Sequence, residues 1–256
     1  MLVDTHSHIH FRKEFPDVDA ILERAKAAGV TRQIIVGCTP KDSFQALDFV
    51  KGHPKYKLWS TLGVHPHNAD EWNDTLESRF EELANSEEKV VGIGEIGLDY
   101  FRNFRPRELQ AGTFKAQLKL AKKLEIPAIV HVRDAWDDAL RFIEEIGNSK
   151  VILHCFTGTA EQARISWQRG HHIAFSGILT YPKNEELRKI AKDAPKDLIL
   201  VETDCPYLPP QLYRGKRNEP AYVVETARVL AHVRGITLDE AGKITTENAL
   251  RLFGIS

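Results

Sequence analysis

Histidines occupy alternate positions close to the start of the chain, at His6, His8 and His10 in the stretch VDTHSHIH. In a β-strand, side chains two residues apart project from the same face, about 6–7 Å apart along the chain. Two imidazoles placed in this way can bind one cation from the same side, and imidazole is a common ligand of divalent transition metals. The spacing therefore predicts that His6 and His8 form a metal clamp. It leaves His10 open as either a ligand or a structural residue.

Further side chains with metal-binding chemistry each follow a short apolar run. They are His65, His67, Glu95, His131, His154 and Asp204. One histidine in such a place is usually a core residue with its hydrogen bonds satisfied. Imidazoles and carboxylates repeated after several separate runs instead indicate one metal centre that is assembled from distant parts of the chain.

These residues must be positioned by secondary structure, and the hydrophobic pattern predicts that each lies at or just after the end of a strand. The predicted strands are residues 2–6, 32–37, 58–64, 89–96, 128–132, 151–155, 172–177 and 198–204. The predicted helices are residues 19–29, 41–51, 75–85, 107–125, 136–147, 160–169, 184–193, 219–234 and 239–253. Strands rich in Ile, Val and Leu that alternate with amphipathic helices imply right-handed βαβ units and a parallel sheet.

Eight strand–helix units in 256 residues indicate a closed (β/α)8 TIM barrel, so we expect a single α/β domain over residues 1–256. The alternative is an open doubly wound sheet, but no GxGxxG motif follows the first strand. Functional side chains of TIM barrels lie at the carboxyl ends of the strands. Those predicted ends carry seven of the 11 histidines together with Glu95 and Asp204. The active site is therefore expected at that end of the barrel.

Strand alternation also predicts the roles of neighbouring side chains. Glu202 and Asp4 each lie two residues before a predicted ligand, on the same face of the strand, so both are expected to orient ligands. The alternative for each is a buried carboxylate that pairs with a Lys or Arg inside the barrel. Cys155 and Cys205 each follow a predicted ligand directly, so they are expected to point outward as small core residues.

Composition excludes several classes of protein. A net charge of −1 provides no overall basic field, so a polyanion must be held by local charge or by metal. The three cysteines have no CxxC spacing, which argues against a disulfide framework and a cysteine zinc site and suits a reducing cytosol. Without an apolar run of about 18 residues or a signal-peptide pattern, we expect a cytoplasmic protein with no membrane segment and no obligate protein partner.

Two predicted loops at the same end combine aromatic and basic side chains, YFRNFRPRE at residues 100–108 and YLPPQLYRGKRNEP at residues 207–220. Aromatic faces stack on unpaired bases and cations neutralise phosphates, so such loops suit single-stranded nucleic acid. The alternative is a solvated surface in which each Arg pairs with a neighbour such as Glu108 or Glu219. The substrate-binding candidates, one of them after the fifth strand, are Arg102, Arg133, Lys216 and Arg217.

Several stretches resemble the TatD family of metal-dependent nucleases, within the amidohydrolase superfamily. They are DTHSHIH, GVHPHNA, VVGIGEIGLDYFRN, IPAIVHVRDA, LHCFTG, VETDCPYLPP, RGKRNEP and TTENALRLF, which run from residue 4 to residue 253. The resemblance implies a (β/α)8 barrel that holds two divalent metals, with magnesium-dependent activity in several relatives. His10 departs from the family pattern, which often has Asp or Asn at this position.

The resemblance also implies roles for individual residues. The implied ligands are His6, His8 and Asp204 for one metal, His131 and His154 for the other, and Glu95 as a bridge between them. His65 is implied to lie near the substrate phosphate. Glu95 and Asp204 are the predicted catalytic residues.

A paired metal centre lowers the pKa of a bound water and polarises a P=O or C=O oxygen, and Asp204 is placed to accept the proton of that water. The prediction is therefore a hydrolase that uses two divalent ions, Mg, Mn or Zn, and acts as a deoxyribonuclease or exonuclease on single-stranded DNA ends. One alternative is hydrolysis of a small ester, lactone or amide, including aminoacyl-tRNA esters. The other is a non-enzymatic metal-binding protein, although structural metal sites are usually closed by four protein ligands. Glu95 argues against those amidases in which a carboxylated Lys bridges the metals.

Overall fold

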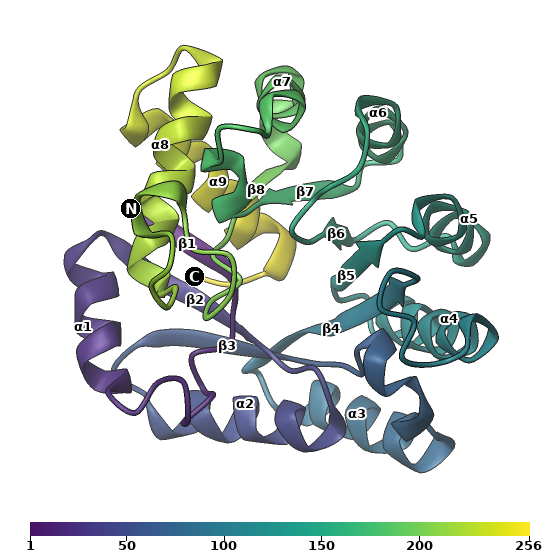
Figure 1. The fold of residues 1–256 in the computed structure, drawn as a ribbon. Coiled ribbons are helices and arrows are strands. Elements are labelled where there is room, and N and C mark those ends of the chain that lie inside the picture. The colour runs from purple at the N-terminus through teal and green to yellow at the C-terminus, as the bar shows by residue number, and fades with distance from the viewer.

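A ring of eight parallel strands forms the centre of the molecule in the computed structural model, which describes residues 1–256 (Figure 1). The strands pair in sequence order: β1 (Leu2–Ser7), β2 (Val30–Val36), β3 (Lys57–Leu62), β4 (Val90–Asp99), β5 (Ala128–Arg133), β6 (Val151–Leu153), β7 (His172–Phe175) and β8 (Ile199–Val201). A parallel bridge between Ser7 and Cys205 closes the ring. The architecture is the predicted (β/α)8 barrel.

Helices surround the ring and connect successive strands (Figure 1). They are α1 (Val18–Ala27), α2 (Pro40–Gly52), α3 (Asp74–Ser86), α4 (Arg107–Lys123), α5 (Trp136–Ile146), α6 (Ala160–Gln168), α7 (Glu185–Asp193), α8 (Val223–Arg234) and α9 (Leu238–Phe253). Local sequence signals fix their ends: Thr237 and Glu240 form a capping box at the start of α9, and Gly254 ends it at a φ of 66°, which glycine adopts without steric penalty. None of the helices is long and apolar enough to cross a membrane.

The helix α9 seals the amino-terminal end of the barrel. It contacts β1 and β8, and Figure 1 shows it in yellow across the ring of strands. Its last turns pack against inward-facing strand residues in a buried cluster that comprises Val3, Ile34, Val36, Trp59, Val91, Ile129, Ile152, Ala174, Leu200, Ala249, Leu252 and Phe253. Because this end is filled with apolar side chains, the polar side chains of the strands gather at the opposite end.

The strands differ from their predicted bounds by a few residues, and the differences in β4, β6 and β8 bear on the site. β6 and β8 end at Leu153 and Val201, so His154 and Asp204 lie in the segments just beyond them. β4 instead continues to Asp99. The extra residues include Asp99, which adds a carboxylate at the carboxyl end of the barrel.

The prediction that Cys155 points outward is wrong. Cys155 lines a cavity at the carboxyl end of the barrel. The regular strand β6 has already ended at Leu153, and the backbone of Cys155 has a φ of 43°, so side chains no longer alternate between the two faces. Cys205, by contrast, is fully buried in an apolar cluster with Ile9 and Phe15, as predicted.

Candidate metal centre

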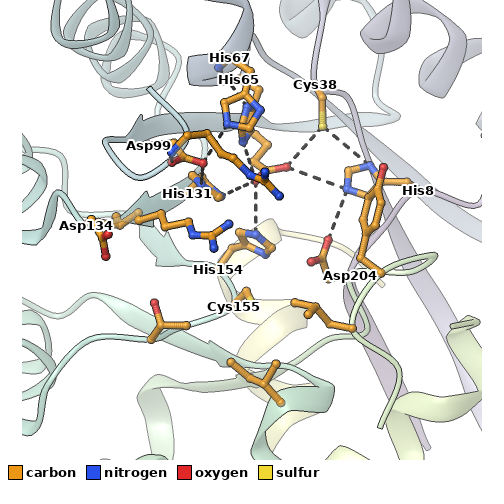
Figure 2. Close-up of a pocket in the computed structure, with 18 of the residues that line it drawn as sticks. His8, Cys38, His65, His67, Asp99, His131, Asp134, His154, Cys155 and Asp204 are labelled. Carbon is orange, nitrogen blue, oxygen red and sulfur yellow. Dashed lines mark hydrogen bonds and ion pairs between the residues drawn. The ribbon is translucent and has the colours of Figure 1, made fainter. Parts of the chain in front are cut away.

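The predicted ligands gather around a cavity of about 970 Å³. Figure 2 shows His8, His131, His154 and Asp204 turned towards one another from different parts of the barrel. His6 is the one predicted ligand that does not line the cavity, because it is fully buried below its floor. Helices, sheet pairing and the sealed opposite end therefore bring together residues that are up to about 200 positions apart in the sequence.

Glu95 lies between two sets of imidazoles. Its Oε2 is 3.6 Å from Nε2 of His6 and 4.0 Å from Nε2 of His8. Its Oε1 is 3.0 Å from Nδ1 of His131 and 3.3 Å from Nε2 of His154. Each oxygen of the carboxylate thus faces a separate group of imidazole nitrogens, so each could hold a cation together with its own group.

The first group is completed by Asp204. The Nε2 atoms of His6 and His8 are 3.1 Å apart, and Oδ1 of Asp204 lies 3.9 Å and 3.6 Å from them, respectively. Nδ1 of His8 is 2.8 Å from the carbonyl oxygen of Val36. Because a carbonyl only accepts hydrogen bonds, Nδ1 carries a proton, and Nε2 faces the cluster, where it would offer a lone pair to a cation when the ring is neutral.

The second group is oriented by Glu202, which is fully buried. Its Oε1 accepts hydrogen bonds from Nδ1 of His154 at 2.9 Å and from the backbone N–H of Cys155 at 2.6 Å. With a proton on Nδ1, a neutral His154 would present its Nε2 lone pair to a cation, whereas a second proton on Nε2 would be donated to Oε1 of Glu95 at 3.3 Å. His65 also joins this group, since its Nε2 lies 3.5 Å from Oε1 of Glu95.

Asp4 is fully buried and contacts the backbone of a predicted ligand. It touches no ligand side chain, but accepts hydrogen bonds from Oγ1 of Thr203 at 2.6 Å, from the backbone N–H of Thr203 at 2.9 Å and from that of His6 at 3.3 Å. It therefore ties the end of β1 to the segment after β8. Burial raises its pKa to about 8. Neither Asp4 nor Glu202 forms an ion pair with a Lys or Arg, so the alternative of a buried cation partner does not apply.

Burial and contacts with neighbouring side chains shift the pKa values of the cluster residues. Burial acts to raise the pKa of Glu95, but the imidazoles of His154 and His65 outweigh it and hold that pKa well below its ordinary value. Burial acts to lower the pKa of His154, but Glu202 and Glu95 raise it well above its ordinary value. Burial and the nearby His154 lower the pKa of His6 to about 4. A neutral His6 and an ionised Glu95 are the protonation states that metal ligands require.

The donor set fits divalent cations. Imidazole nitrogens and carboxylate oxygens converge from several sides, and when the imidazoles are neutral such acceptors repel one another unless a cation lies between them. Three-residue groups have all their ligand atoms within 4.8 Å of one another, among them His6, His8 and Asp204. Imidazole and carboxylate together are typical of Zn and other transition metals.

Sequence reasoning missed Asp99 as a part of this site. Its Oδ2 is 2.8 Å from Nε2 of His67 and 3.5 Å from Nε2 of His131, and its Oδ1 accepts a hydrogen bond from the backbone N–H of Arg102 at 2.8 Å. Burial acts to raise the pKa of Asp99, but these contacts lower it overall. Asp99 lies four residues after Glu95, so a longer predicted strand 4 would have placed it at the same end.

Cys38 and His10 are also placed by contacts that no short motif shows. Sγ of Cys38 lies 3.3 Å from Oε2 of Glu95, and burial raises the pKa of this thiol well above its ordinary value. His10 lies outside the cluster, with Nε2 2.7 Å from Oδ1 of Asp42. The other oxygen of Asp42 accepts a hydrogen bond from the backbone N–H of Cys38 at 2.7 Å. His10 thus braces the segment that carries Cys38.

The basic candidates divide into two groups. Arg102 and Arg133 line the cavity, and the guanidinium of Arg133 lies 3.9 Å from the ring centre of Phe101. Lys216 and Arg217 do not line it. Arg217 donates to the backbone carbonyl of Glu14 and lies over the ring of Phe15. That arginine therefore holds the segment after β1 in place.

The TatD-related DNase family model matches residues 3–254. The chain belongs to the TatD family. A relative in Bacillus subtilis strain 168, named "Uncharacterized metal-dependent hydrolase YabD", is 38% identical over 258 residues, which cover 100% of both chains. The "3'-5' ssDNA/RNA exonuclease TatD" of Erwinia tasmaniensis is 38% identical over 249 residues, which cover 93% of this chain and 94% of the relative.

A solved structure confirms the fold of this TatD-family chain. YJJV, a TatD homologue from Escherichia coli K12, superposes with a TM-score of 0.93 at 29% identity and covers 100% of this chain and 98% of its own. The protein is therefore a metal-dependent hydrolase of the TatD family that acts on ester bonds.

Proposed function

We propose that this TatD-family hydrolase cleaves phosphodiester bonds at the ends of single-stranded DNA or RNA and uses two divalent metal ions bridged by Glu95. The observation that carries the proposal is the carboxylate of Glu95, whose oxygens face separate groups of imidazoles. The substrate class is supported by a relative at 38% identity that is named as a 3'-5' ssDNA/RNA exonuclease.

The two groups of donors suggest how the metals are shared. The proposed ligands are His6, His8 and Asp204 for one ion, His131 and His154 for the other, and Glu95 for both. When bound, the ions polarise the phosphoryl oxygen and lower the pKa of water. Mg, Mn and Zn are the metals to compare, and the many imidazoles favour Mn or Zn because Mg prefers oxygen ligands.

Asp204 is placed to take the proton of the attacking water. Its side chain is 12% exposed and borders the cavity, and Oδ1 lies 3.6 Å from Nε2 of His8. The backbone N–H of Asp204 donates to the carbonyl of His6 at 2.9 Å, which fixes its position relative to the first group of ligands. A carboxylate held between ligand cluster and solvent can act as a general base.

The cavity wall supplies contacts for a nucleotide chain. The guanidinium groups of Arg102 and Arg133 can neutralise phosphate charge at the cavity edge. Phe101 and Phe104 in the same loop are 57% and 58% exposed, respectively, which leaves ring faces for stacking on unpaired bases. Both features favour a single strand over a small ester or amide.

A substrate panel tests the proposal. The purified protein is incubated with single-stranded DNA, single-stranded RNA, a lactone, a small amide and an aminoacyl-tRNA, each with Mg, Mn or Zn and with a chelator control. We expect mononucleotides to be released from the nucleic acids and the chelator to abolish this release. Hydrolysis of the lactone, amide or aminoacyl ester without nucleotide release would replace the proposal with the alternative hydrolase class.

A further inference from the structure

A second cavity, of about 850 Å³, lies beside the metal centre. It is bordered by the segment His10–Glu14, by residues of α2 and by Tyr207. Phe11 and Tyr207 also line the first cavity, so the two cavities meet at this aromatic pair. The proposed hydrolysis assigns no role to the second cavity.

Three cations line the second cavity, Arg12, Lys13 and Lys41. Their side chains are exposed, and none of them has a carboxylate oxygen within 4.0 Å. Other loop arginines differ, because Arg105 and Arg217 are held in ion pairs at 2.6 Å and 3.2 Å, respectively. The three cations are therefore free to bind an anionic ligand.

The carboxylates of the second cavity limit what that ligand can be. Glu14 and Asp48 also line it, so three cations face two carboxylates and the net charge of the lining is +1. Asp42 does not line it and is engaged by His10 at 2.7 Å. Separated cations in a mixed lining favour a ligand whose negative charges are spaced along a chain, rather than one compact polyanion.

The aromatic pair joins this lining to the proposed metal ligands. The ring of Phe11 stacks on His8 with 5.0 Å between ring centres and 13° between planes. The ring of Tyr207 lies 6.3 Å from that of His8, and Tyr207 is 54% exposed. An exposed aromatic face next to free cations is the combination that binds unpaired bases and their phosphates.

We propose that the second cavity binds the nucleotides of a single strand that adjoin the cleaved linkage. This inference rests on the proposed function. The terminal nucleotide occupies the metal-site cavity, and the chain crosses Phe11 and Tyr207 into the second cavity. There Arg12, Lys13 and Lys41 contact phosphates and Tyr207 stacks on a base. A duplex offers no free base face to this pair, so the cavity selects single strands.

Substrate length and salt dependence test the inference. Hydrolysis of a dinucleotide and of an octanucleotide of the same base is measured for the wild type, for Arg12→Ala/Lys41→Ala and for Lys119→Ala. Octanucleotide binding is measured by fluorescence anisotropy in chelator at several salt concentrations. Lys119 is the matched control, because it is exposed on α4 and has no ion pair. Arg12→Lys/Lys41→Arg keeps both charges and checks for misfolding.

We expect the wild type to have a lower KM for the octanucleotide than for the dinucleotide. In Arg12→Ala/Lys41→Ala the ratio of the dinucleotide KM to the octanucleotide KM should shrink about tenfold. The magnitude of the slope of log affinity against log salt should decrease by about 2. The charge-keeping variant and Lys119→Ala should keep both values. If the double variant cleaves both substrates with unchanged length dependence and salt slope, the role of the second cavity is overturned, but the proposed function is not. If the wild type released no nucleotide from either substrate with any metal, the proposed function would fail and this inference with it.

Discussion

The carboxylate of Glu202 accepts a hydrogen bond from Nδ1 of His154 at 2.9 Å, and this contact decides which nitrogen of the ring faces Glu95. Glu202 is fully buried, and the same oxygen, Oε1, also accepts a hydrogen bond from the backbone N–H of Cys155 at 2.6 Å. A carboxylate that orients a histidine in this way makes the opposite nitrogen a better ligand. We therefore expect Glu202 to orient a metal ligand without touching the metal.

Glu202→Gln should lower the affinity of one metal site by about 10–100-fold, since glutamine keeps the shape and an acceptor oxygen but loses the charge. The measurement is a titration of metal-free protein with Zn or Mn against a chromophoric chelator. Glu186→Gln is the control, because Glu186 forms only an exposed pair with Lys189. Equal affinities in wild type and Glu202→Gln would show that the contact only supports the fold.

Asp204→Asn should separate chemistry from binding. The amide keeps one ligand oxygen but cannot accept the proton, so turnover should fall by about 10²–10⁴-fold while the affinity for single-stranded DNA changes little. Metal content is measured on the same sample, because a weakened site would also slow the reaction. Near-full turnover with normal metal content would exclude Asp204 as the general base.

Arg133→Ala should weaken the binding of single-stranded DNA and lower its salt slope by about 1, because one phosphate contact is lost. Arg102→Ala should act in the same direction. Arg105→Ala serves as the comparison, since that guanidinium is already paired with Asp70 at 2.6 Å. The assay is anisotropy of a labelled oligonucleotide over a range of salt. Unchanged slopes in Arg133→Ala and Arg102→Ala would mean that this edge of the cavity is only solvated surface.

Acid should destabilise the protein through His171 and His172, which are buried and whose ring nitrogens have no hydrogen-bond partner. Burial, followed by Arg169 for His171 and Arg251 for His172, lowers each pKa from 6.5 to about 4. Between these values the unfolded chain binds protons that the folded chain does not. Stability is therefore lost as the pH falls from 6.5 towards 4, by about 3 kcal/mol for each histidine.

Urea unfolding at neutral pH and at about pH 4.5, with chelator throughout, measures this loss. His171→Gln and His172→Gln should each show a smaller difference between the two conditions than the wild type. His232→Gln, a change at an exposed position on α8, should behave as the wild type does. If all four proteins lose the same stability between neutral pH and about pH 4.5, groups other than His171 and His172 cause the loss.

Much of this arrangement could be predicted from the sequence, because a barrel converts position along the chain into position in space. His131 lies two residues after Ile129, and His154 two residues after Ile152; both isoleucines belong to the sealed interior cluster. Alternation alone therefore predicts that the two histidines point inward at the other end. In the structure β5 and β6 are neighbouring strands, so the two histidines lie side by side.

The rest depended on where regular structure stops and on contacts across the fold. His10 has the same parity as His8, but β1 ends at Ser7, so the chain has left the barrel before His10 is reached. The contact of His10 with Asp42 joins residues 32 positions apart, and no local pattern shows it. The same is true of Arg217, which is 203 positions from the carbonyl that it contacts.

Metal content, measured by elemental analysis after loading and gel filtration, shows whether Glu95 bridges two metal ions. We expect two ions per chain in the wild type, a loss from both sites in Glu95→Ala, and a loss of mainly one ion in His131→Ala. Circular dichroism of each variant confirms that the barrel is intact. A wild type that holds at most one ion per chain, or a folded Glu95→Ala that still holds two, would show that Glu95 does not bridge two metals.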